Sequence, residues 1–193
     1  MNKKIILAII FFIFLLIAVP LIQSLFFTQQ TSGKIVINQH IDASYLQKSD
    51  KDFILVFFGY VGCVNVCTPV LHDLNTFYES KGFAPLKPFV AFSFINLIPE
   101  LESNQPEMFA KSFNPEFKGI YLSQKELMTV DRDFALFFSK SLRDVGEIDH
   151  SDHLYLIERQ KNGSLILKNI YTMHPLNKDI IIKDILKLQK DRE

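Results

Sequence analysis

The 193-residue sequence contains no tryptophan and only two cysteines, and its formal net charge at pH 7 is zero. Two cysteines cannot build the disulfide framework of a small secreted scaffold. The basic residues form no block, so nucleic-acid binding has no electrostatic support. The sequence also shows no carboxylate cluster for a hard metal ion, no internal repeat and no low-complexity segment. What remains is a chain whose chemistry depends on one pair of thiols.

The N-terminal segment has the composition of a membrane anchor. Lys3 and Lys4 precede an uncharged apolar run from Ile5 to Ile22, which is broken only by Pro20; Leu25-Phe26-Phe27 follows beyond Gln23-Ser24, so Ile5–Phe27 is long enough to span a bilayer. About 20 apolar residues span a bilayer as a helix, whereas the apolar core of a cleaved signal peptide has about 7–15 residues and ends at a small-x-small site. No such site follows the run, which favours an uncleaved transmembrane helix within residues 1–27 over a cleaved signal. The lysines then keep the N-terminus in the cytoplasm.

The rest of the chain is therefore expected on the outer face of the cytoplasmic (inner) membrane, in the periplasm of a diderm bacterium. Residues 28–33 form a polar tether, and residues 34–193 have the length of one globular domain. Apolar runs predict strands at Lys34–Asn38, Phe53–Phe58, Phe89–Ile95, Phe117–Leu122, His153–Glu158 and Leu165–Tyr171. Helical spacing predicts helices that start near Pro69 and stop at Gly82, and at Asn104–Phe113, Gln124–Ser139 and Asn177–Gln189.

This order predicts an α/β domain with a mixed sheet flanked by helices. Phe53–Phe58 is apolar throughout, which suits a central strand that is buried on both faces. Asn162-Gly163 predicts a hairpin, so the two strands that it joins are antiparallel.

Both cysteines fall at the predicted junction between the central strand and the first helix of the domain. Gly59 and Gly62 give the loop backbone freedom, and Cys63 and Cys67 are close enough in sequence to act together. Because Cys67 lies near a helix N-terminus, with Thr68 or Cys67 itself as N-cap, we expect its thiolate form to be favoured. Such a pair suits either disulfide exchange or a soft metal ion. A permanent disulfide across so short a loop would stabilise the domain little.

A metal ion held by two thiolates needs further ligands, and imidazole is a ligand for both copper and zinc. The candidates are the five histidines: His40, His72, His150, His153 and His174. His72 lies five residues after Cys67 on the same predicted helix and points about 140° away from it, so we expect it to face solvent. The polar loop before the strand His153–Glu158 can approach the cysteine loop, which favours His150 over His153 as the third ligand.

Two segments together resemble a known family. The stretch from Phe57 to Pro69 is similar to the cysteine signature of the Sco/SenC family, membrane-anchored copper proteins that help to build the copper centre of cytochrome c oxidase. Ile148-Asp149-His150-Ser151, followed by an apolar strand, is similar to the second signature of that family. The resemblance covers Lys34 to about Leu188 in overall order. It implies a thioredoxin-like fold with an inserted hairpin, and copper, Cu(I) or Cu(II), held by Cys63, Cys67 and His150.

The same resemblance implies a copper chaperone that donates copper to the copper-bearing subunit of cytochrome c oxidase or to another copper or thiol partner. Cys63 and Cys67 would also serve as a redox pair with thiol-disulfide reductase activity toward that partner. Whether such a metallochaperone also acts as an enzyme stays open. Zinc also fits this ligand set, although copper is favoured. The alternative function is a metal-independent thiol-disulfide oxidoreductase, for which a C-x-x-C spacing would be more usual.

The chain departs from the family pattern at three positions near the cysteines. Val64 and Asn65 stand where the family usually has proline and aspartate, and Asn96 stands where an aspartate follows the second buried strand. These departures remove two carboxylates but no ligand. They therefore bear on the partner and on local charge more than on the identity of the metal.

Overall fold

The computed structural model describes residues 3–5, 7, 11–16, 18–19, 33–141 and 147–192. The chain divides into two compact units, Met1–Lys34 and Ile35–Glu193. The described residues before residue 20 are helical. Over the described ranges, no helix is both long and apolar enough to cross a membrane. Residues 20–32, which include the end of the predicted anchor and most of the tether, lie outside these ranges, so the membrane anchor stays a prediction.

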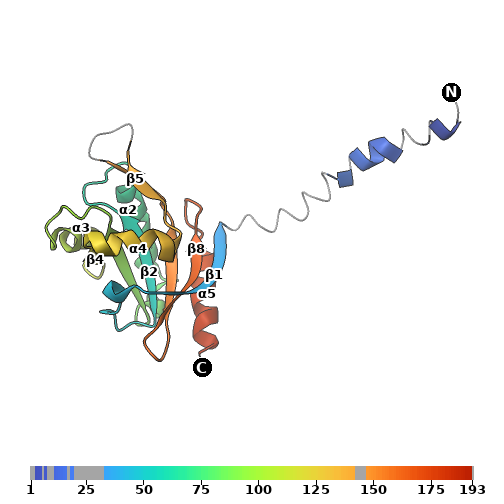
Figure 1. The fold of residues 1–193 in the computed structure, drawn as a ribbon. Helices are drawn as coiled ribbons and strands as arrows, with labels where there is room; N and C mark the ends of the chain where they lie inside the picture. The colour runs from blue at the N-terminus through green and yellow to red at the C-terminus, as the bar shows by residue number, and fades with distance from the viewer. Residues whose placement is uncertain are drawn as a thin grey trace. The chain divides into compact units, whose positions relative to one another are not determined.

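The second unit contains a six-stranded sheet in the order β1-β8-β7-β2-β3-β4 (Figure 1). The strands are β1 (Lys34–Ile41), β2 (Phe53–Gly59), β3 (Val90–Asn96), β4 (Lys118–Tyr121), β7 (Leu154–Arg159) and β8 (Leu165–Tyr171). β2 pairs parallel with β3 and antiparallel with β7, and β7 pairs antiparallel with β8. The predicted mixed sheet and hairpin are therefore confirmed. Every residue of β2 and β3 is buried, which explains why both strands are largely apolar, with Ser93 and Asn96 as the buried polar residues of β3.

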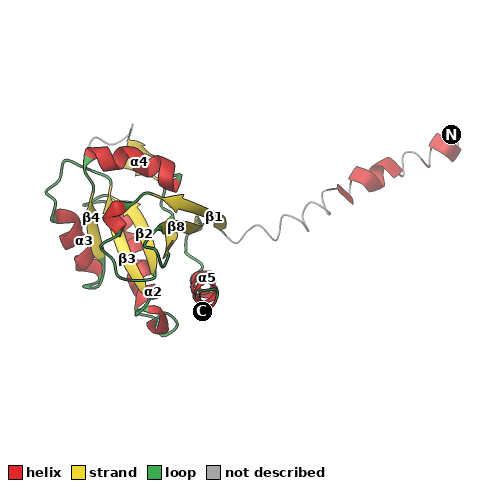
Figure 2. Cartoon of the chain, turned by 60° about the horizontal axis from the view of Figure 1, so that its bottom comes forward, coloured by secondary structure: helices red, strands yellow, loops and turns green. Residues whose placement is uncertain are grey.

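Helices cover both faces of this sheet, with α4 above it and α2 and α5 below it in Figure 2. The helices are α2 (Cys67–Tyr78), α3 (Gln105–Phe113), α4 (Gln124–Phe134) and α5 (Lys178–Lys190), with short 3-10 turns at Ser44–Leu46 and Ala84–Leu86. The apolar cluster below the sheet includes Leu74 of α2 and Ile181 of α5. The cluster above it includes Val130 of α4.

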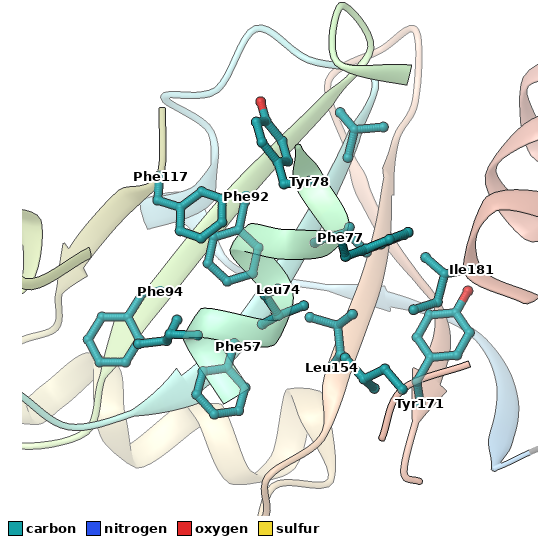
Figure 3. Packing of buried hydrophobic residues seen from close by; sticks show 14 of the residues in the cluster. Phe57, Leu74, Phe77, Tyr78, Phe92, Phe94, Phe117, Leu154, Tyr171 and Ile181 are labelled. Atoms are coloured by element: carbon teal, nitrogen blue, oxygen red, sulfur yellow. The ribbon is translucent and has the colours of Figure 1, made fainter. Parts of the chain in front are cut away.

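Aromatic packing fixes α2 against the sheet. Figure 3 shows Leu74 and Phe77 of α2 beside Phe92 and Leu154 of the strands. The ring of Tyr78, at the end of α2, lies 5.4 Å from that of Phe117, which in turn lies 4.1 Å from the ring of Phe92 in β3, measured between centroids. Each fully buried side chain of this size contributes about 1.5–3 kcal/mol. The first turn of α2, which carries Cys67, is thereby held at the carboxyl end of β2.

The predicted helix Gln124–Ser139 is wrong beyond Phe134. A capping box between Ser123 and Glu126 starts α4, but Ala135 adopts a left-handed conformation, with φ of 49° and ψ of 36°, and ends it. Phe137, which the predicted helix included, is 64% exposed. Phe138–Lys140 then forms β5, which pairs antiparallel with β6 (Ile148–His150). The helical spacing of phenylalanines continued past the true end of the helix and concealed a short strand.

We expect Ala135→Gly to raise the free energy of unfolding by about 0.5–1 kcal/mol, because glycine adopts the left-handed conformation without the penalty that a Cβ carries. Urea denaturation of both proteins measures the change. The control, Ala110→Gly, lies within the right-handed helix α3 and should lower stability. If both variants lose stability, the left-handed conformation at Ala135 is contradicted.

Candidate metal centre

Three side chains with metal-binding atoms meet at the carboxyl end of β2. Cys63 comes from the loop after β2, Cys67 is the first residue of α2, and His150 is the last residue of β6. One ligand atom from each lies within 4.8 Å of the other two. The sulfur of Cys67 is 3.5 Å from Nε2 of His150. In residues 33–141 and 147–192 and the described N-terminal positions, no other group of three histidine, cysteine or acidic side chains has this spacing.

Backbone hydrogen bonds hold the loop that carries the cysteines. The amide of Cys63 donates to the carbonyl of Tyr60 over 3.2 Å. The carbonyl of Cys63 accepts from both the amide and the hydroxyl of Thr68, at 3.2 and 2.8 Å. The amide of Cys67 donates to the sulfur of Cys63 over 3.2 Å. Val66 precedes the first helical residue, so the predicted N-cap at Thr68 or Cys67 is wrong by one or two positions.

Glycine is required at the end of β2 because a sulfur atom occupies the space of a side chain. A Cβ at Gly59 would lie 2.7 Å from the sulfur of Cys67 and 3.1 Å from the ring of Phe94. Gly62 has a different reason, since its φ of 89° is rarely adopted by residues with a side chain. The two glycines of the loop therefore serve a close approach and a turn, respectively.

His150 is held in the tautomer that a metal ligand needs. Its Nδ1 lies 3.0 Å from the carbonyl oxygen of Ser151, which can only accept a hydrogen bond. The ring proton therefore belongs on Nδ1, and the lone pair of Nε2 faces the sulfur of Cys67. The rings of Tyr60 and Phe57 approach the imidazole edge-on, with centroids 6.0 and 6.5 Å away.

Burial controls the protonation of the thiols. Cys67 is 0% exposed and Cys63 is 4% exposed, and both are free cysteines. Burial raises the pKa of the Cys67 thiol well above its ordinary value, and a hydrogen bond with the Cys63 side chain adds to this effect. The expectation that the helix N-terminus would favour the Cys67 thiolate is wrong for the metal-free site, because desolvation outweighs the dipole. Burial also raises the pKa of Tyr60, which is hydrogen-bonded to the Cys63 side chain.

The other four histidines take no part in this group. His40 and His72 are exposed, as expected for His72. His153 is half-buried near the ring of Tyr155, and burial lowers its pKa. The Nε2 atom of His174 lies 2.6 Å from the carbonyl oxygen of Asp152. The preference for His150 over His153 therefore agrees with the geometry.

The elements that orient His150 were not predicted from the sequence. β5 pairs Phe138 with His150, and the carbonyl of Ser151 fixes the ring. No local signal identified β5, because its residues continued the helical pattern before it. The aromatic residues Phe57 and Tyr60 were visible in the sequence, but nothing in their spacing indicated that they border an imidazole.

The donor set determines which metals fit. Two sulfur atoms and one imidazole nitrogen suit soft or borderline ions such as Cu(I) and zinc, and do not suit calcium or magnesium. Val64, Asn65 and Val66 between the cysteines are exposed, so the buried ligands lie directly under an exposed loop.

Comparisons with known proteins agree with this geometry. A family model described as SCO1/SenC matches residues 31–188. The human mitochondrial protein SCO1 homolog is 26% identical over 119 residues, which cover 58% of this chain and 40% of that protein. The chain spans between 40% and 64% of the length of four such curated relatives.

Two solved structures show the same fold. Copper-bound ScoI from Arabidopsis thaliana has a TM-score of 0.58 and 22% identity, and the match covers 73% of this chain and 89% of that one. BsSco, described as a member of the Sco family of cytochrome c oxidase assembly proteins with a disulfide switch, has a TM-score of 0.52 and 16% identity. That match covers 79% of this chain and 95% of BsSco.

Proposed function

This chain belongs to the SCO1/SenC family, and on that premise we propose that it is a copper-binding chaperone whose cargo is held by Cys63, Cys67 and His150. The observation that carries the proposal is the convergence of these three ligand atoms within 4.8 Å. The tautomer of His150 supports it, because Nε2 already presents a lone pair toward the sulfur of Cys67. Copper is preferred to zinc because the related ScoI structure contains copper and the donor set fits it.

The recipient that we propose is the copper-bearing subunit of cytochrome c oxidase or another copper or thiol protein. The description of BsSco as a member of a family of cytochrome c oxidase assembly proteins supports this choice. We also propose that the apolar N-terminal segment anchors the chain in the cytoplasmic membrane, with the metal centre on the extracytoplasmic side. The composition of residues 5–27 and the lysines before them support the anchor.

A second candidate function is thiol-disulfide exchange with a partner protein, in addition to copper binding or without it. It is favoured by two free thiols whose sulfur atoms lie within 4.8 Å of each other. Turnover of a disulfide substrate by metal-free protein, measured for wild type and for His150→Ala, separates the two functions. Activity that is unaffected by metal removal and by loss of His150 would favour the oxidoreductase.

We expect His150→Ala to weaken Cu(I) binding by at least about tenfold and to change the absorption spectrum of the Cu(II) complex, because one of three ligands is lost. Competition with a Cu(I) chelator and titration with Cu(II) measure the two effects. The control is His72→Ala, which removes an exposed imidazole from α2, the helix that also carries Cys67. Unchanged affinity and spectrum in His150→Ala, or equal losses in both variants, would show that His150 is not a ligand.

A further inference from the structure

Asn96 is a fully buried polar residue next to the loop that carries the cysteines. It is the last residue of β3 and is 0% exposed. Its Oδ1 accepts a hydrogen bond of 3.1 Å from the amide of Val61, two residues before Cys63. Its Nδ2 donates to the carbonyl oxygen of Ile98 over 2.5 Å. Both ends of this one side chain are therefore occupied by backbone groups from two different loops.

A second hydrogen bond ties the same two loops together. The amide of Leu97 donates to the carbonyl oxygen of Gly59 over 2.7 Å. Gly59 is the residue whose Cα faces the sulfur of Cys67, and Val61 leads directly into Cys63. The end of β3 thus holds the backbone behind both sulfur atoms. A buried amide is costly unless its polar atoms are paired, so this arrangement is maintained only while both loops keep their positions.

We propose that Asn96 is a positioning residue for the metal centre, which fixes the Cys63 loop through the amide of Val61 without bringing a charge. The proposal rests on the proposed function, because it assumes that Cys63 and Cys67 bind copper. Asn96 touches neither the ligand atoms nor the ion. It acts through the loop, by limiting the positions that the sulfur of Cys63 can adopt relative to Cys67 and His150.

The absence of charge is part of the proposal. Two thiolates already place negative charge at the site when a metal is bound, and a third negative group nearby would favour the more positive, oxidised ion. The side-chain oxygen of Asn96 accepts the hydrogen bond from the backbone N–H of Val61, as a carboxylate oxygen could. Its side-chain nitrogen also donates to the carbonyl oxygen of Ile98, which a carboxylate could not do. Asn96 therefore positions the loop while leaving the reduced form, Cu(I), favoured.

Two substitutions separate position from charge. Asn96→Ala removes both hydrogen bonds and should lower the affinity for Cu(I) by about 10- to 100-fold and alter the Cu(II)–thiolate absorption bands. Asn96→Asp keeps the acceptor, so it should retain more affinity than Asn96→Ala, and it should lower the Cu(II)/Cu(I) reduction potential where the introduced carboxyl is ionised, a state that its burial disfavours. Chelator competition, absorption spectra and spectroelectrochemistry of the purified chain measure these quantities.

Asn114→Ala is the matched control. Asn114 is also buried, and its Oδ1 accepts a hydrogen bond from the backbone amide of Glu116. Its Nδ2 donates to the side chains of Asn75 and Glu79. Asn75 and Glu79 lie toward the other end of α2 from Cys67. Asn114→Ala should lower the free energy of unfolding about as much as Asn96→Ala does. Its copper affinity and absorption spectrum should remain those of the wild-type protein.

The outcomes distinguish this inference from the function on which it rests. Unchanged copper affinity and spectrum in Asn96→Ala, or an equal loss in Asn114→Ala, would overturn the positioning role. Infrared spectroscopy shows whether the carboxyl introduced by Asn96→Asp is ionised: an unchanged or raised reduction potential with an ionised carboxyl, or a changed potential with a protonated one, would overturn the role of charge. If Asn96→Ala does not fold, Asn96→Ser, whose shorter side chain cannot reach the amide of Val61, takes its place, and wild-type affinity and spectrum in that variant overturn the positioning role. If wild-type protein binds no copper, or binds it independently of His150, the proposed function itself is wrong.

Discussion

Gly59→Ala is expected to weaken Cu(I) binding by about 10- to 100-fold although no ligand is removed. The added methyl group would lie 2.7 Å from the sulfur of Cys67, closer than such atoms approach in proteins, and 3.1 Å from the ring of Phe94, which is a tight contact. Gly59 is fixed by its pairing with Asn96 in β3 and by the hydrogen bond from Leu97, so the strand cannot move away freely. The sulfur of Cys67 must therefore shift, which disturbs its distance to Nε2 of His150.

The same substitution should lower the free energy of unfolding by about 1–3 kcal/mol, the usual cost of overpacking a core. Chelator competition measures the affinity, and urea denaturation of the metal-free protein measures stability. Gly82→Ala is the control, because its Cβ would meet only the end of the Ile182 side chain, at 3.3 Å. Wild-type affinity in Gly59→Ala would mean that the sulfur of Cys67 does not occupy the position described.

Cu(I) affinity is expected to fall at least tenfold for each unit by which the pH is lowered between about 9 and 6. Burial raises the pKa of the Cys67 thiol above its ordinary value, so this group is protonated throughout that range in the metal-free protein. A metal binds the thiolate, and its binding must release this proton. If the thiol had its ordinary pKa, the Cu(I) affinity would stop rising with pH near about pH 8.5. With the raised pKa of Cys67, the affinity should keep rising up to about pH 9.

Affinity measured by chelator competition at several pH values tests this result, with the chelator's own proton affinity taken into account. Cys67→Ser should bind copper more weakly and release about one proton fewer, because serine has no thiol to deprotonate. An affinity that is constant between pH 6 and 8 would contradict the protonated, buried Cys67 that the geometry indicates.

Most of the sheet could be predicted from the sequence because the patterns are long and uninterrupted. Phe53–Phe58 is apolar throughout, and Phe89–Ile95 is apolar except for the buried Ser93, since β2 and β3 are buried on both faces. Asn162-Gly163 identified the β7–β8 hairpin, although the loop is longer than a two-residue turn: the amide of Gln160 donates to the carbonyl of Ser164, and the amide of Gly163 donates to the carbonyl of Gln160. The three residues of the candidate centre were also identified, although their convergence depends on pairing between distant segments.

What could not be predicted depends on tertiary contacts. The end of α4 at Ala135 lacks a glycine or proline, and the phenylalanines after it keep a helical spacing, so β5 was concealed. The protonation of Cys67 was predicted wrongly because burial, which the sequence does not report, outweighs the helix dipole. Asn96 was visible only as a departure from a family pattern, since its partners Val61 and Ile98 are brought to it by the fold.

The most direct test of the central claim is X-ray absorption spectroscopy of the copper-loaded protein in the reduced state. Coordination by Cys63, Cys67 and His150 predicts two sulfur scatterers and one nitrogen scatterer with the outer-shell pattern of an imidazole. That imidazole pattern should be absent from the His150→Ala spectrum and present in the His72→Ala spectrum. A wild-type spectrum with no imidazole pattern, or with fewer than two sulfur scatterers, would contradict the assignment of this site as a copper centre.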